Sequence, residues 1–270
     1  MNKFKSLKTL FFASSVILLS YACEKLEQDK VDTETQSAVD NAIAEGSFTQ
    51  IFPVINDIGV NDDGIEKNSL GGDTACYTVT DYKDSVIIDF KNGCVDELGR
   101  LRRGIIKADF NGKWKDIGAT VVVTFRDFDI DLMKYEGQMI FSRDGLYKFT
   151  RKIQGGKLIH PDWSILYDGN QTIEQTEGYT SDLAIKDTVS FDNVFKFTGK
   201  TSGTNRKGLK YTSEITVPII KKESCKYIQS GIYQITPDSL PSRIINFGDG
   251  TCDSKATVTV NGKVTEIKLE

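Results

Sequence analysis

The spacing of apolar and polar residues divides the chain into three parts with different predicted structures. Residues 10–19 form a ten-residue run that is mostly apolar and carries no charge. Residues 33–60 repeat apolar positions at three- and four-residue intervals, which predicts an amphipathic helical segment. From residue 76 onward, short runs alternate between apolar and polar residues, which predicts β-strands.

The helical segment at residues 33–60 carries one apolar stripe, made of Val39, Ala42, Ile43, Ile51, Phe52, Ile55 and Ile58. Asp32 or Thr33 is suited to cap its start. Gly46 and Pro53 interrupt the pattern, so two short helices or a kinked one are predicted. We expect the stripe to pack on a β-sheet; a partner-binding helix is the alternative.

The alternating part of the chain is rich in Val, Ile, Thr, Phe and Tyr, and Gly, Asn and Asp separate its runs. The predicted strands are 76–80, 85–90, 104–110, 119–131, 137–142, 147–153, 189–199, 211–220, 231–236, 243–247, 256–260 and 264–269. No long helical pattern separates them, which favours antiparallel pairing over βαβ units. The sequence therefore predicts a mainly β fold over residues 70–270, either an antiparallel β-sandwich or an extended β-roll, after one N-terminal helical segment.

Two details of these runs predict local structure. The apolar positions switch from odd to even numbers between residues 119–125 and 128–132, so a β-bulge or bend is expected near Arg126 and Asp127. Asn261-Gly262 lies between two alternating runs, which is a strong signal for a two-residue hairpin turn. That turn would pair Val260 with Lys263.

The N-terminal residues have the pattern of an export signal. Lysines 3, 5 and 8 precede the apolar run, which at ten residues is too short to span a bilayer as a helix. Ala22-Cys23 follows, and a small residue directly before cysteine resembles the lipobox of bacterial lipoprotein signals. The resemblance implies that residues 1–22 are removed and that Cys23 carries lipid. An ordinary secretory signal and an uncleaved anchor are the alternatives.

Composition adds limits on function. The chain has 38 acidic and 34 basic residues; removing the three lysines of the signal leaves 31 basic residues and a net charge of −7. Nucleic acid is therefore not expected as a partner, and lipid alone would hold the protein on a membrane. Residues 23–32 are almost wholly polar and are predicted to be a flexible tether. The protein is expected in the bacterial cell envelope, at the outer membrane, with its periplasmic or surface face left open.

The five cysteines divide into one plus four. With Cys23 assigned to lipid, Cys76, Cys94, Cys225 and Cys252 remain, and four cysteines allow three disulfide connectivities. Residues 87–94 resemble residues 244–252, and a strand-opening cysteine precedes each segment. This echo favours Cys76–Cys94 and Cys225–Cys252, and suggests two similar halves at about 76–155 and 185–270. Free buried thiols and shared hairpin composition are the alternatives.

Candidate chemistry is sparse in the sequence. A single histidine, His160, excludes a multi-histidine metal site, and its place before Pro161 favours a turn. Two acidic sets are candidate calcium ligands, with a solvated surface as the alternative. The first set is Asp127, Asp129 and Asp131, and the second is Asn246, Asp249 and Asp253. The aromatic residues considered for stacking on sugar, with a core role as the alternative, are Trp114, Trp163 and Tyr167. No catalytic residue, metal site or cofactor is predicted.

Several segments together resemble a group of Bacteroidetes envelope lipoproteins of unassigned function. The segments are 38–48 (AVDNAIAEGSF), 76–80 (CYTVT), 118–128 (GATVVVTFRDF), 199–208 (GKTSGTNRKG) and 248–253 (GDGTCD). The resemblance implies an envelope lipoprotein with a β-rich body and supplies no catalytic residues. We expect a non-catalytic binding or structural role, with a glycan or an envelope protein as partner. A glycan hydrolase using a carboxylate pair and an accessory subunit of an outer-membrane assembly are the alternatives.

Overall fold

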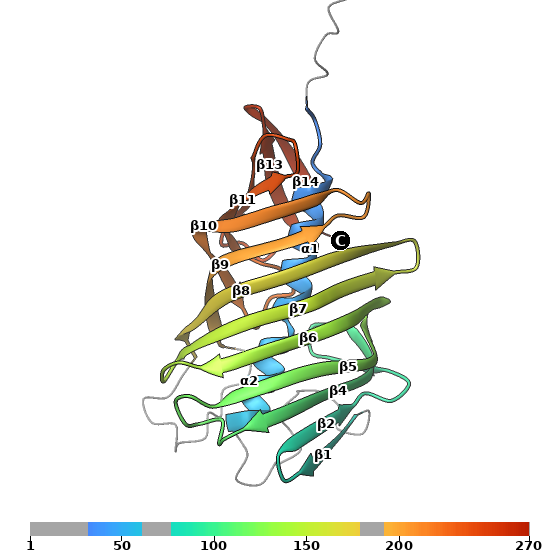
Figure 1. The fold of residues 1–270 in the computed structure, drawn as a ribbon, viewed down its shortest axis with the longest axis vertical. Helices are drawn as coiled ribbons and strands as arrows, with labels where there is room; N and C mark the ends of the chain where they lie inside the picture. Colours follow the sequence, from blue (N-terminus) through green and yellow to red (C-terminus); the bar gives the residue numbers. More distant parts are fainter. Residues whose placement is uncertain (1–31, 61–76, 179–191, 270) are drawn as a thin grey trace, which may run out of the picture. The chain divides into compact units, whose positions relative to one another are not determined.

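The β-sheet of the computed structural model follows the order of the chain. The structure describes residues 32–60, 77–178 and 192–269. In this part of the chain, the strands form one antiparallel sheet running from β1 at one edge to β14 at the other (Figure 1). The strands pair in the order of the chain, except that β2 pairs with β4 and the two-residue β3 pairs with β4 beside this path.

Two helices precede fourteen strands among the described residues. Their bounds are α1 Gln36–Thr49, α2 Ile51–Val60, β1 Thr78–Tyr82, β2 Ser85–Asp89, β3 Cys94–Val95, β4 Leu101–Asn111, β5 Thr120–Ile130, β6 Met133–Arg143, β7 Lys148–His160, β8 Trp163–Glu177, β9 Val194–Thr204, β10 Lys210–Lys222, β11 Ser230–Pro237, β12 Arg243–Asp249, β13 Lys255–Val260 and β14 Lys263–Lys268. The predicted class, mainly antiparallel β after an N-terminal helical segment, is confirmed. A single sequential sheet is closer to the predicted roll than to a sandwich of two separate sheets.

The sheet curls around the helices. In Figure 1, α1 and α2 run across the strands on one face of the sheet, and α1 contacts β8, β10, β11 and β12. Every residue of both helices is buried or half-buried. A helix covered by a flat sheet would keep one solvent-facing side, so the strands must enclose α1 from several directions. No helix in the described part of the chain is long and apolar enough to cross a membrane.

An aromatic core joins the helices to the sheet. Phe52 of α2 packs against Phe141, Phe149 and Phe195, with ring centroids 4.8–5.3 Å apart. Phe48 of α1 stacks on Tyr167 and meets Tyr135 edge-on. Burying such side chains contributes about 1.5–3 kcal/mol each, and it fixes the helices against the middle of the sheet.

The predicted interruption of β5 is confirmed. Asp127 has a φ of 48°, and the pairing of β5 with β6 shifts between Thr124 and Asp129. Gly104 of the neighbouring strand has a φ of 79°, and a Cβ atom there would clash with the Asp127 backbone. A glycine is therefore needed where the two strands bend together. Leu132, expected to continue the inward face, is instead exposed in the following turn.

The C-terminal hairpin has the predicted register. Val260 pairs with Lys263 and Val258 pairs with Thr265. Asn261 has a φ of 49° and Gly262 a φ of 78°, the left-handed conformations that this turn type requires.

The helical segment divides at Gln50 into two helices. Of the two predicted alternatives, two short helices or a kinked one, the first is confirmed. Pro53 lies in the first turn of α2, where proline costs no helical hydrogen bond. The predicted apolar stripe is correct for α2 but wrong for part of α1. Val39 and Ile43 are only half-buried, whereas the polar residues Ser37, Asn41, Glu45 and Thr49 are buried.

The structure describes only some of the predicted segments of the chain. The signal at 1–22 and all but the last residue of the tether at 23–32 lie outside the described residues. Asp32–Glu270 forms one compact unit, and the sheet continues from one predicted half into the other. The internal repeat therefore remains a prediction.

Candidate functional site

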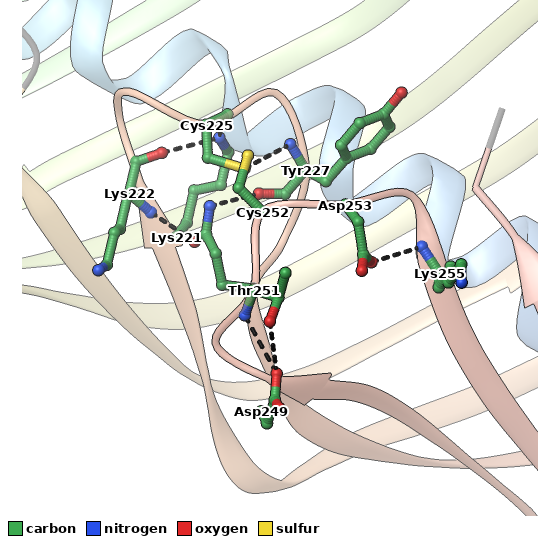
Figure 2. Close-up of a disulfide and its surroundings, with 10 residues drawn as sticks. Lys221, Lys222, Cys225, Tyr227, Asp249, Thr251, Cys252, Asp253 and Lys255 are labelled. Carbon is green, nitrogen blue, oxygen red and sulfur yellow. Dashed lines mark hydrogen bonds between the residues drawn. A yellow bond between two sulfur atoms is a disulfide. The ribbon is translucent and has the colours of Figure 1, made fainter.

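A disulfide fastens the loops at one end of β10–β13. Cys225 lies in the loop between β10 and β11, and Cys252 in the loop between β12 and β13, with their Cα atoms 5.8 Å apart (Figure 2). This predicted pair is confirmed. Cys225 is buried and Cys252 is exposed, so the bond ties a surface loop to the interior.

The other cysteines are less fully described. Cys94 is buried and is itself disulfide-bonded. Its predicted partner Cys76 and the predicted lipid attachment site Cys23 lie outside the described residues. The Cys76–Cys94 pairing and the modification of Cys23 stay predictions.

The loop that carries Cys225 is organised around buried Gln229. The Gln229 side chain accepts a hydrogen bond from the backbone N–H of Lys222 at 2.7 Å and donates one to the carbonyl of Tyr227 at 2.9 Å. The Gln229 carbonyl also accepts from the N–H of Gly250, which links this loop to the one carrying Cys252. The disulfide, drawn in Figure 2, and the hydrogen bond between Gly250 and Gln229 together hold the two loops in one arrangement.

A lysine is buried beneath the same loop. Lys221 is 4 % exposed, and its Nζ donates to the carbonyl oxygens of Lys222, at 3.0 Å, and Cys225. Burial lowers the pKa of Lys221 to about 7, and the nearby positive charge of Arg100 acts in the same direction. A lysine pKa this close to 7 is unusual, and it shows that burial and the charge of Arg100 both disfavour the protonated ammonium form.

The predicted acidic set in the C-terminal turns lines a shallow surface depression. This depression has a volume of about 260 Å³, and its walls include Asn246, Asp249 and Asp253. Their side-chain oxygens accept hydrogen bonds from nearby backbone N–H groups, those of Gly248, Thr251 and Lys255. These oxygens stabilise the turns. Among the described residues, no cluster of three metal-binding side chains occurs.

The second acidic set is divided among three cations. Asp129 pairs with Arg103 at 2.9 Å, Asp127 with Lys134 at 3.0 Å, and Asp131 with Lys226 at 3.4 Å. The three carboxylates therefore do not converge on one point, and the calcium interpretation is wrong for this strand. Asp127 does not follow the alternation of Asp129 and Asp131, because the bulge gives its backbone a positive φ.

The interior holds a polar cluster that the sequence did not reveal. Glu45 of α1 is fully buried and pairs with Arg151 of β7 at 2.6 Å. It also accepts hydrogen bonds from Gln171 at 2.9 Å, Tyr233 at 2.6 Å and Tyr167. Burial alone would raise the pKa of Glu45, but the Arg151 charge and these three hydrogen bonds outweigh it and hold the pKa at about 2. Glu45 is therefore an ionised, fully partnered carboxylate.

Neighbouring turns of α1 continue this polar contact with the sheet. Asn41 accepts from Ser213 at 2.9 Å and from Thr201 at 3.1 Å. Asp40 pairs with Arg206, which donates from both its backbone and its side chain. The contacts fix both the rotation and the position of the helix along its axis, because the side-chain oxygens of Asp40 and Asn41 each have specific partners.

The aromatic residues considered for sugar stacking are placed differently from one another. Trp114 is buried, with its Nε1 donating to Asn56, and Tyr167 is buried against Glu45. A surface sugar site is therefore wrong for these two. Trp163 is half-buried, and the ring of His160 stacks on it at 4.9 Å while the guanidinium of Arg206 lies 3.8 Å from its ring centroid.

His160 lies at the end of β7, beside a tight turn that leads to β8. Its Nδ1 accepts a hydrogen bond from the backbone N–H of Asp162 at 3.3 Å. The predicted turn is found at residues 161–162, and His160 itself is the last strand residue before it, with its ring packed against Trp163.

Searches of protein-family models, curated proteins and solved structures found no match to this chain.

Proposed function

We propose that this protein is a lipid-anchored lipoprotein of the bacterial cell envelope, with a binding or structural role rather than a catalytic one. The anchor is proposed from the sequence: a basic start, a ten-residue apolar run and Ala22-Cys23. One acyl chain binds a membrane only marginally, whereas several on one residue give stable anchoring.

The observation that carries the proposed role of the β body is the way its interior is filled. Concave sheets and barrels often hold ligands in their interior, but here α1 occupies that position through Glu45 and its partners. The carboxylate of Glu45, whose pKa is lowered to about 2, thus holds the helix in place. The surface loops at the ends of the strands are then the parts that meet other molecules.

The disulfide supports an exported location. Disulfides persist in the oxidising periplasm and cell surface and are rare in the cytosol. The Cys225–Cys252 bond stiffens two loops at one end of the strands, which suits a body that presents a fixed surface outside the cytoplasm.

Replacing Cys23 with alanine tests the anchor directly. The Cys23→Ala protein is expected in the soluble fraction of lysed cells, whereas the wild-type protein should sediment with membranes and be released by detergent. The matched control is Cys94→Ala, which keeps the signal intact and should still sediment. Sedimentation of Cys23→Ala with membranes to the wild-type extent would contradict the proposal.

A further inference from the structure

Two arginines share one carboxylate near the end of α1. Arg100 Nη2 lies 2.7 Å and Arg102 Nε 3.0 Å from Asp96 Oδ2, and Arg100 Nη1 donates to Gln50. Arg100 is 6 % and Arg102 4 % exposed. Burial acts to raise the pKa of Asp96, but the two guanidinium groups outweigh it and lower the pKa. Asp96 is therefore ionised and fully engaged.

The disulfide loop approaches these arginines through an exposed lysine. Lys226, in that loop, pairs with Asp131 at 3.4 Å, and Asp131 Oδ1 accepts from the backbone N–H of Leu101 at 2.9 Å. This chain of contacts brings the loop against the start of β4, between the two arginines. Lys221, held under the same loop by the Cys225 carbonyl, is close enough for Arg100 to lower its pKa.

The charges in this cluster do not balance. Two buried guanidinium groups, those of Arg100 and Arg102, share the single carboxylate of Asp96. Arg102 Nη1 is buried and has no hydrogen-bond partner among the described residues. Buried cations are costly unless they are paired, and an unmet N–H donor costs about 1–3 kcal/mol.

We propose that this cluster, with Arg102 Nη1 as the principal donor, binds a small oxyanion. A phosphate, sulfate or carboxylate group would satisfy the unpartnered guanidinium donor and supply the missing negative charge. Arginine suits this ligand because its planar donors match two oxygens at once. The inference stands apart from the membrane anchor, since it concerns residues of the folded body.

A titration of thermal stability tests the site. The full-length protein is heated at increasing inorganic phosphate, with chloride used to keep the ionic strength constant. The melting temperature of the wild type should rise with the phosphate concentration and then level off as the site fills. Arg102→Gln should weaken the apparent affinity for phosphate at least tenfold. Arg103→Gln is the matched control, because Arg103 pairs with Asp129 on the other face of the same strand and should leave the affinity within twofold of wild type.

Two further arms make the result decisive. In the wild-type protein, the side-chain Nε–Hε NMR signal of Arg102 should shift with phosphate at the same half-saturation, which answers the question even if Arg102→Gln does not fold. Glycerophosphate binding as tightly as free phosphate would identify a lipid-headgroup source, and weaker binding would identify a free oxyanion. A non-saturating response, or one equal in Arg102→Gln and Arg103→Gln, would overturn the proposal and indicate a general salt effect.

Discussion

Replacing Glu45 with glutamine is expected to lower the free energy of unfolding by about 3–5 kcal/mol at pH 7. The substitution keeps the shape of the side chain but removes its charge, leaving the guanidinium of Arg151 buried without its counter-ion. Tyr167 and Tyr233 lose a charged acceptor at the same time. Urea denaturation of the two proteins measures the difference. The exposed Glu136→Gln is the control and should change stability by less than about 0.5 kcal/mol.

The same residue predicts a dependence on pH. The pKa of Glu45 is about 2 in the folded protein and 4.5 in its reference state. The unfolded chain therefore takes up the proton first as the pH falls. The stability that Glu45 contributes is complete above about pH 4.5 and is lost as the pH falls towards 2, a loss on the order of 3 kcal/mol.

The wild-type protein should accordingly lose more stability between pH 5 and pH 2 than Glu45→Gln does. Parallel curves for the two proteins would contradict the assignment of an ionised Glu45. A double variant, Glu45→Gln with Arg151→Met, should be more stable than Glu45→Gln alone, because it removes the unpaired charge as well.

Removing the Cys225–Cys252 bond is expected to cost about 3–4 kcal/mol. The two cysteines are 27 residues apart, and the chain-entropy model gives this cost for a loop of that length. The test is urea denaturation of a variant with both cysteines changed to serine. Reductant alone is not a substitute, since it would also reach the bond at Cys94. Ser224→Ala in the same loop is the control. A loss below about 1 kcal/mol in the double variant would show that the disulfide contributes little to the free energy of unfolding.

Much of the fold follows from local patterns in the sequence. The C-terminal hairpin was predictable to the residue because Asn261-Gly262 fixes the turn and the turn fixes the register. The bulge at Asp127 was predictable because a change of apolar parity needs one extra residue. Both signals act over a few residues and depend on no distant partner.

Strand β8 was missed for a physical reason. Its inward positions include Gln171, which is buried in the Glu45 cluster, and Gly169 lies in the middle of the strand. An alternating apolar pattern cannot reveal a polar residue that points inward. The partner that makes this burial possible, Glu45, is 126 residues away in the sequence.

The polar contacts of α1 show the same limit. Ser37, Asn41, Glu45 and Thr49 recur every four residues, which places them on one helix face. In the sequence such a row is typical of a solvated face, and the apolar stripe predicts that the opposite face is the buried one. Only the curled sheet, which contacts α1 from β8 and from β10–β12, supplies partners for both faces.

The mass of the N-terminal peptide tests the proposed identity most directly. The protein is purified from cells in detergent and digested, and the first peptide is analysed by mass spectrometry. We predict a peptide that begins at Cys23 and carries a diacylglyceryl group on its sulfur and an acyl chain on its amine. A peptide that begins elsewhere, or one with an unmodified Cys23 thiol, would contradict the assignment of this protein as a lipid-anchored envelope lipoprotein.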